Sequence, residues 1–273
     1  MPFVTGRSLE CAPNRTSSVQ WMSAGGKGEH VAGDFSQVLL ALGVFAGAVV
    51  SGFSGFAFSA VAGAVLLHVL PPSEAVPLMM VCSVLVQGTS LVSLRRQIEW
   101  RAGAPLVAGG LLGLPPALYV LLHADPTLFR MGFGIFLAAY ASYMLLRPAV
   151  RYFRNARGPW YEVVVGFAGG LVGGMTAMPG AVPTIWCDLR GLPKDRQRGV
   201  VQPYITAMQI AALAVLALRH GLPEALPGHV LFALVPLAAG TLAGLVLFGR
   251  VSEGLFRRVL LSVLLVSGVI YVI

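Results

Sequence analysis

The chain of 273 residues is 56% hydrophobic and only 11% charged, and its mean hydropathy is +0.79. This number of charges is too small to solvate the surface of a soluble globular protein of this length. The composition therefore excludes a soluble domain and indicates an integral membrane protein. The net charge of +8 comes from bases gathered in short loops between apolar segments. Because cytoplasmic loops of membrane proteins are basic for topological reasons, we expect a lipid bilayer and no nucleic acid as partner.

The first 35 residues form a polar, Gly- and Ser-rich tail. They contain no apolar stretch of the length found in signal peptides, which argues against a cleaved signal. We predict a disordered tail over residues 1–35, and the sequence leaves open whether translation starts at Met22 instead of Met1.

Ten apolar segments follow the tail. In the first half they cover residues 37–51, 57–70, 73–94, 102–122 and 127–146, and in the second half residues 161–177, 181–189, 197–218, 229–249 and 255–273. The last three segments of each half are long enough for roughly 30 Å of helix, which crosses the hydrocarbon of a bilayer. Segments 57–70 and 181–189 are too short to cross. The sequence thus predicts an all-α, polytopic membrane protein in which each half has three full spans and a short or broken helix pair.

Basic residues fix the predicted orientation. Most of the nineteen Lys and Arg residues fall in four loops, at 95–101, 147–157, 190–198 and 250–258. The positive-inside rule makes these loops cytoplasmic and places both termini outside, whether each short helix pair crosses the membrane or folds back as a re-entrant hairpin. We therefore expect a multi-pass protein of a bacterial inner membrane with both termini in the periplasm.

The two halves resemble each other at a spacing of 122 residues. This shift aligns FAGAVVSG at 45–52 with FAGGLVGG at 167–174, and it also aligns Gln87 with Gln209. Each half crosses the membrane an odd number of times, so the two copies have opposite orientations. The sequence predicts two inverted repeats, residues 36–150 and 151–273, which is an architecture typical of transporters with a site near the bilayer midplane.

The junction after the first segment of each repeat is the predicted binding site. Glycines and a proline there favour a helix break at membrane depth, and a helix that begins inside the bilayer presents free N–H groups and the positive end of its dipole. An anion is the expected occupant. Close packing of helices is the competing explanation for the small residues, and the sequence leaves it open. The candidate residues at the two junctions are Ser51, Gly52, Ser54, Gly55, Gly174, Thr176, Pro179 and Gly180.

Polar residues inside the two long spans are the second part of the predicted site. Gln87 and Gln209 are related by the repeat, and Gln202 lies on the same helix face as Gln209. Such a polar stripe is expected to face a wet cavity, although hydrogen bonding between helices explains it as well. Arg198 at the cytoplasmic end of this stripe is a candidate for recruiting anions. No Asp or Glu lies in the interior of a full span, and the cysteines and histidines form no metal-binding pattern, so we expect no cofactor and no metal.

The two junction sequences, FAGAVVSGFSGFAF and FAGGLVGGMTAMPG, are each followed by a short helix, a Leu-Pro turn and a long span. Over about residues 44–273 this pattern resembles the sulfite exporter TauE/SafE family of bacterial membrane transporters. The resemblance implies transport of sulfur oxyanions or organosulfonates, such as sulfite or sulfoacetate, across the inner membrane, and no enzymatic activity. Members of the family usually carry a run of glycines where this chain has Gly55 to Phe58 and Ala177 to Gly180. This departure leaves the substrate open and puts Phe56, Phe58 and Met178 among the candidate lining residues.

Two alternatives to a carrier follow from the residues. The string from Gly52 to Gly55 has the GxSG pattern of intramembrane serine hydrolases, with Ser54 as the nucleophile, but no histidine is predicted at membrane depth to serve as its base. An anion channel is the other alternative, and it would need several copies of the chain to build a pore. The sequence leaves a homo-oligomer open.

Overall fold

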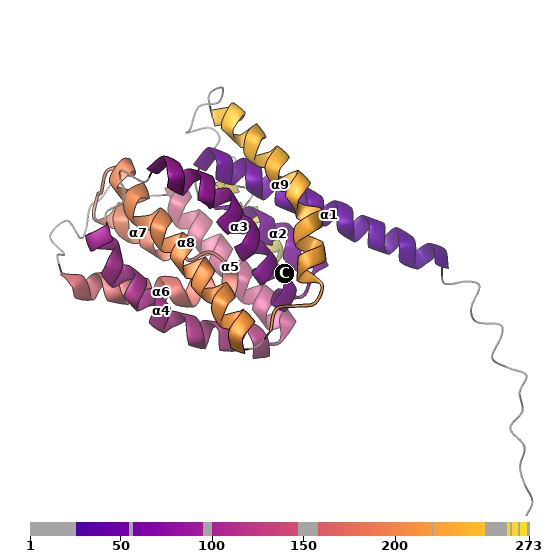
Figure 1. Ribbon diagram of the computed structural model, residues 1–273, viewed down its shortest axis with the longest axis horizontal. Coiled ribbons are helices and arrows are strands. Elements are labelled where there is room, and N and C mark those ends of the chain that lie inside the picture. Colours follow the sequence, from indigo (N-terminus) through magenta and orange to yellow (C-terminus); the bar gives the residue numbers. More distant parts are fainter. Residues whose placement is uncertain are drawn as a thin grey trace, which may run out of the picture. The chain divides into compact units, whose positions relative to one another are not determined.

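A computed structural model describes residues 26–54, 57–94, 100–146, 158–219, 221–248, 261–262, 264–266 and 268–271. Within these residues the backbone forms helices joined by short turns (Figure 1). The helices are α1 (Gly26–Ser54), α2 (Phe58–Val69), α3 (Pro72–Leu94), α4 (Trp100–His123), α5 (Pro126–Leu146), α6 (Pro159–Thr176), α7 (Ala181–Leu189), α8 (Lys194–Arg219) and α9 (Leu226–Phe248). Most of the residues described from Leu261 to Tyr271 are helical as well. The predicted all-α fold is confirmed.

Long apolar helices confirm the membrane class. Among the residues described, four helical stretches are long and apolar enough to cross a bilayer: Gly103–His123, Pro126–Leu146, Arg196–Arg219 and Leu226–Leu247. They coincide with the predicted spans 102–122, 127–146, 197–218 and 229–249. The predicted span 73–94 is also a single helix, α3, and the short segment predicted at 181–189 is α7 with the same bounds.

The start of the first helix differs from the prediction. α1 begins at Gly26, upstream of the apolar run expected from residue 37, so that part of the predicted tail is helical. The difference has a simple reason: apolar composition marks where a helix can enter lipid, whereas backbone hydrogen bonding can continue into polar sequence that contains no proline. Residues Leu39–Ile273 make up one compact unit, which contains α1 from Leu39 onward.

The short helices α2 and α7 fold back along the helices that precede them. A β-carbon added at Gly43 of α1 would lie 3.0 Å from the β-carbon of Val65, and one added at Gly47 would lie 2.9 Å from the carbonyl oxygen of Phe58, so α1 and α2 run antiparallel in contact. In the second half Glu162 near the start of α6 forms an ion pair with Arg190 just after α7. The start of α6 and the end of α7 therefore lie beside each other, so the two helices form an antiparallel hairpin.

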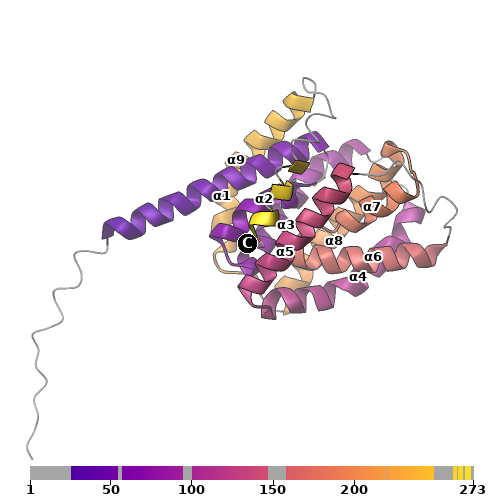
Figure 2. The same cartoon turned by 180° about the vertical axis from the view of Figure 1, so that it is seen from behind.

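Glycines let each hairpin pack tightly against a long helix of the other half. Gly166 and Gly170 of α6 meet α4 so closely that added β-carbons would lie 2.0 Å from the carbonyl oxygen of Leu106 and 2.2 Å from that of Gly110. In the same way Gly240 and Gly244 of α9 meet α1, with 2.5 and 2.3 Å to the carbonyl oxygens of Phe45 and Val49. Figure 2 shows α4 and α6 side by side along their lengths. Only glycine allows backbones to approach to this distance.

Helices α3 and α8 occupy the centre of this arrangement. They contact each other, α3 also packs against α2 and α9, and α8 also packs against α7 and α4. Tyr204 of α8 is fully buried, and its hydroxyl donates a hydrogen bond of 2.8 Å to the carbonyl oxygen of Gly166. Several polar residues in the middle of these two helices are buried within the protein: Ser83, Gln87, Gln202, Thr206 and Gln209.

Several features recur at the spacing of 122 residues. α1 ends at Ser54 and α6 at Thr176, while α3 begins at Pro72 and α8 at Lys194. Contacts recur too: Gly47 meets Phe58 and Ala62 of α2, and Gly169 meets Pro179 and Pro183 beside and within α7. These correspondences are the ones expected from an internal repeat, in which the first hairpin packs on α9 and the second on α4.

Candidate functional site

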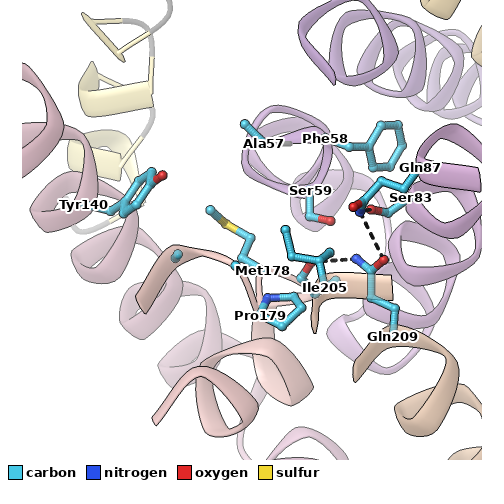
Figure 3. Close-up of a pocket in the computed structure, with 13 residues that line it drawn as sticks. Ala57, Phe58, Ser59, Ser83, Gln87, Tyr140, Met178, Pro179, Ile205 and Gln209 are labelled. Carbon is cyan, nitrogen blue, oxygen red and sulfur yellow. Dashed lines mark hydrogen bonds between the residues drawn. The ribbon is translucent and has the colours of Figure 1, made fainter. Parts of the chain in front are cut away.

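A small cavity lies where the two hairpins turn, between the ends of α1 and α6 and the centres of α3 and α8 (Figure 3). Its volume is about 30 Å³, enough to hold water, and it is partly open to its surroundings. None of the described residues that line it is charged. They are Ala57, Phe58, Ser59, Ser83, Gln87, Tyr140, Ala177, Met178, Pro179, Gly180, Ala181, Ile205 and Gln209.

Two alanines in a left-handed backbone conformation form the turns of the hairpins. Ala57, which precedes α2, has a φ of 73°, and Ala177, which follows α6, has a φ of 56°. Among the residues described they are the only positions other than glycine with positive φ, and both line the cavity. Left-handed backbone costs an alanine about 1 to 2 kcal/mol. Strain of this kind at both turns of one cavity points to a functional site.

Local hydrogen bonds hold the second turn. The hydroxyl of Thr176 donates to the carbonyl oxygen of Val172 at 2.7 Å and accepts from the backbone N–H of Met178 at 3.3 Å. The N–H of Ala177 bonds to the carbonyl oxygen of Gly173 at 2.9 Å, which closes the last turn of α6. Thr176, predicted as a ligand of the substrate, thus has its hydroxyl engaged by the backbone on both sides of the turn.

Replacing Ala177 with glycine is expected to raise the free energy of unfolding by about 1 kcal/mol, because glycine adopts the left-handed conformation after a helix without the steric penalty of alanine. The measurement is the thermal unfolding midpoint of the purified protein in detergent. Ala181→Gly is the matched control, because Ala181 is the first residue of α7 and has no positive φ, so glycine relieves no strain there and should not raise the same midpoint. A fall in both variants would contradict the assignment of strain to Ala177.

The first turns of α2 and α7 both face the cavity. Neither helix has a side chain that caps its N-terminus: Ala57 precedes α2 and Gly180 precedes α7. In α2 the N–H groups of Phe58, Ser59 and Ala60 precede the first hydrogen bond of the helix, from Val61 to Ala57. α7 has fewer donors, because Pro183 has no N–H and Ala181 bonds to Met178 at 3.2 Å. The α2 end is therefore the stronger site for negative charge.

The two repeat-related glutamines meet at the cavity. The amide nitrogen of Gln87 donates to the hydroxyl of Ser83 at 2.8 Å and to the side-chain carbonyl of Gln209 at 3.4 Å. The amide nitrogen of Gln209 donates to the backbone carbonyl of Ala177 at 3.3 Å (Figure 3). A chain of hydrogen bonds thus links α3, α8 and the turn that ends α6.

Two buried polar atoms at the cavity have no hydrogen-bond partner among the residues described. They are the side-chain carbonyl oxygen of Gln87 and the hydroxyl of Ser59, and both side chains are only 3% exposed. Leaving a buried polar atom without a partner costs about 1 to 3 kcal/mol, so such atoms at a cavity are candidates for ligand contacts.

The structure places some predicted site residues at the cavity and others elsewhere. Gln87, Gln209, Pro179 and Gly180 line it. Gly52 and Gly174 do not, because the helices continue past them to Ser54 and Thr176. Added β-carbons there would lie 2.8 Å from the carbonyl oxygen of Thr241 in α9 and 2.6 Å from Ala117 in α4. These two glycines serve close helix packing, the alternative that the sequence left open.

The remaining predicted residues lie off the cavity or outside the described part. Ser51 and Gln202 are buried but do not line it, and Arg198 at the start of α8 is partly exposed. Gly55 and Phe56 lie outside the described residues, and so does the side chain of Ser54. α1 ends at Ser54 and α6 at Thr176, each two residues beyond the glycine on which the prediction was centred.

Sequence reasoning missed several of the lining residues, among them Ser59, Tyr140 and Ile205. Ser59 follows the turn at Ala57, and a serine near a helix start carries a weak signal for a polar site. Tyr140 and Ile205 come from the long helices α5 and α8, where one aromatic or aliphatic residue among many gives no signal. Their role depends on contacts between helices that are far apart in sequence.

Comparison with protein families gives one match. The model of the sulfite exporter TauE/SafE family matches residues 39–271, whereas neither the curated proteins nor the solved structures gave any match. The matched region contains both hairpins, the central helices α3 and α8 and the cavity between them. The match covers nearly all of the chain, which therefore belongs to the sulfite exporter TauE/SafE family of multi-pass membrane transporters.

Proposed function

We propose that this protein exports small sulfur-containing anions, such as sulfite or organosulfonates, by alternating access to the cavity between the two hairpins. The observation that carries the proposal is the start of two uncapped helices, α2 and α7, at one cavity without charged side chains. Free N–H groups and helix dipoles attract an anion without fixing a permanent positive charge in the protein, so the site stays stable when it is empty.

The lengths of the short helices support a site near the bilayer midplane. α2 has 12 residues and α7 has nine, so they extend about 18 and about 14 Å, roughly half of the hydrocarbon thickness. The ion pair between Glu162 and Arg190 joins both ends of the second hairpin on one side. Flanking basic loops make that side cytoplasmic, and the repeat brings the first hairpin in from the periplasm. We infer that the two hairpins are the inverted elements that open in turn to each side.

The membrane potential supplies enough driving force for export without a coupling ion. Outward movement of one negative charge from a cell interior that is negative by 100 mV gains about 2.3 kcal/mol, which sustains roughly a fifty-fold concentration ratio. The flux of a labelled sulfonate from proteoliposomes should therefore rise when a potassium gradient makes the lumen negative. Flux that is saturable, shows counterflow and responds to the potential supports an electrogenic carrier. If the flux does not depend on the membrane potential, the protein is not an electrogenic uniporter. If the flux does not saturate with substrate concentration, the protein is a channel.

The residues that the structure describes do not support the alternative of a serine hydrolase. The side chain of its proposed nucleophile, Ser54, lies outside the described residues, and the cavity is lined by no histidine there. Membership in a family of transporters favours transport.

A further inference from the structure

We propose that the side-chain carbonyl of Gln87 makes this site selective for monoanions that also carry a neutral hydrogen-bond donor. A sulfonate with a hydroxyl group should then bind more tightly than a sulfonate of the same size and charge without one. This inference rests on the proposed function, because it assumes that the cavity receives the transported anion, and it specifies what that anion must contain.

The orientation of both glutamine amides follows from one backbone group. The carbonyl oxygen of Ala177 can only accept a hydrogen bond, so the amide nitrogen of Gln209 has to face it at 3.3 Å. This leaves the side-chain oxygen of Gln209 toward Gln87, which must present its own nitrogen at 3.4 Å. The second N–H of that nitrogen bonds to Ser83.

Gln87 lines the cavity, and its carbonyl oxygen is consequently the side-chain atom left beside it without a partner in the described part of the chain. Gln87 is 3% exposed, and this oxygen has no hydrogen-bond partner among the residues described. A flip of the amide would place two acceptors face to face at Gln209, so the amide cannot turn its nitrogen toward the guest without losing a bond. The cavity thus offers a fixed acceptor on the α3 side, where a bare anion would be repelled and a donor would be bound.

The first turn of α2, which also lines the cavity, offers donors. The hydroxyl of Ser59 is also without a partner among the described residues, and it lies in the first turn of α2 beside the N–H groups of Phe58 and Ala60. An anionic group fits this end, where it meets the positive pole of the helix and a hydroxyl that can donate. The ligand is therefore expected to have two ends, a negative group at α2 and a neutral donor at Gln87.

The absence of charged groups in the described lining limits the charge of the ligand. The cost of removing an ion from water rises with the square of its charge, whereas its attraction to helix dipoles rises only in proportion to that charge. No lysine, arginine or histidine among the described lining residues offsets the difference. A single negative charge is thus favoured over two, and hydroxyalkyl sulfonates and singly protonated oxyanions meet both requirements.

Equilibrium binding of two matched sulfonates to the purified full-length protein tests this selectivity. 2-Hydroxyethanesulfonate and propane-1-sulfonate have the same charge and nearly the same size, and they differ by a hydroxyl in place of a methyl group. We expect the hydroxylated compound to bind roughly tenfold more tightly, as one hydrogen bond to a buried acceptor predicts. In Gln87→Met, a replacement of similar shape, the ratio of the two dissociation constants should fall to about one. Ser59→Ala should weaken both ligands alike and leave the ratio unchanged.

The outcomes separate this inference from the proposed function. A ratio near one in the unmodified protein, or a tenfold ratio that persists in Gln87→Met, overturns the role of Gln87 while the anion site stands. If Gln87→Met does not fold, Gln209→Met provides the second variant, since it releases the Gln87 amide and should lower the ratio. If neither sulfonate binds and neither is transported, the proposed function fails, and the inference fails with it.

Discussion

Gly166→Ala is expected to lower the free energy of unfolding by about 3 kcal/mol or more, a large part of the stability of an ordinary protein. The β-carbon of the alanine would lie 2.0 Å from the carbonyl oxygen of Leu106. This oxygen belongs to the backbone of α4, so no side chain can rotate to relieve the contact and the two helices have to separate. Separation removes the close contacts of Gly109 and Gly170 as well, because they lie along the same interface.

Gly103→Ala is the matched control for this substitution. Gly103 lies on α4 itself, and a β-carbon added there meets nothing within 4 Å. The thermal midpoint of the Gly103→Ala variant should stay within a few degrees of that of the unmodified protein. This is expected when the free energy of unfolding changes by less than about 1 kcal/mol. Size-exclusion profiles in detergent and thermal unfolding measure both variants. Equal stability of the two would show that the packing of α4 on α6 is looser than described.

Gln209→Met is expected to reduce the affinity for the transported anion roughly tenfold or more and to lower the thermal midpoint. The substitution leaves the carbonyl oxygen of Ala177 without the donor that bonds it at 3.3 Å, and it removes the acceptor that holds the amide of Gln87. An unpartnered buried carbonyl costs about 1 to 3 kcal/mol. Anion-dependent thermal shifts and transport kinetics measure the two effects.

Thr206→Val provides the control on the same helix. Among the residues described, the hydroxyl of Thr206 bonds within α8, to the carbonyl oxygen of Gln202 at 3.1 Å, and Thr206 does not line the cavity. Its replacement should change anion affinity less than twofold. A double-mutant cycle between Gln87→Met and Gln209→Met should also show coupling, because the two side chains share a hydrogen bond. Strictly additive effects would mean that each glutamine acts alone.

The lengths of the apolar segments predicted the helices well, because a polypeptide that crosses a bilayer in one apolar segment has to be helical. The segment 181–189 became α7 with the same bounds, since Pro179 and Gly180 before it and Gly191 after it interrupt the helix on both sides. The repeat spacing of 122 residues also paired Gln87 with Gln209, and the structure brings these two side chains together. Both results depend on local composition or on similarity within the chain.

The assignment of the glycines required information that the sequence does not contain. Gly52 and Gly174 belong to the same small-residue pattern as the turns that follow them, and either packing or breaking a helix would explain them. Whether such a glycine packs or breaks a helix depends on which helix lies against it. This helix is α9 for Gly52 and α4 for Gly174. Those helices lie far away in sequence. For the same reason the left-handed turns at Ala57 and Ala177 were unexpected, because alanine is a strong helix former and carries no turn signal.

The packing of α1 against α9, a helix of the other half, has a consequence for biosynthesis. α1 is synthesised before its glycine-lined partner α9, and α2 to α8 lie between the two in the chain. The close backbone contacts at Phe45 and Val49 can therefore form only after α9 has been synthesised, so α1 acquires this part of its packing only once the second half is present.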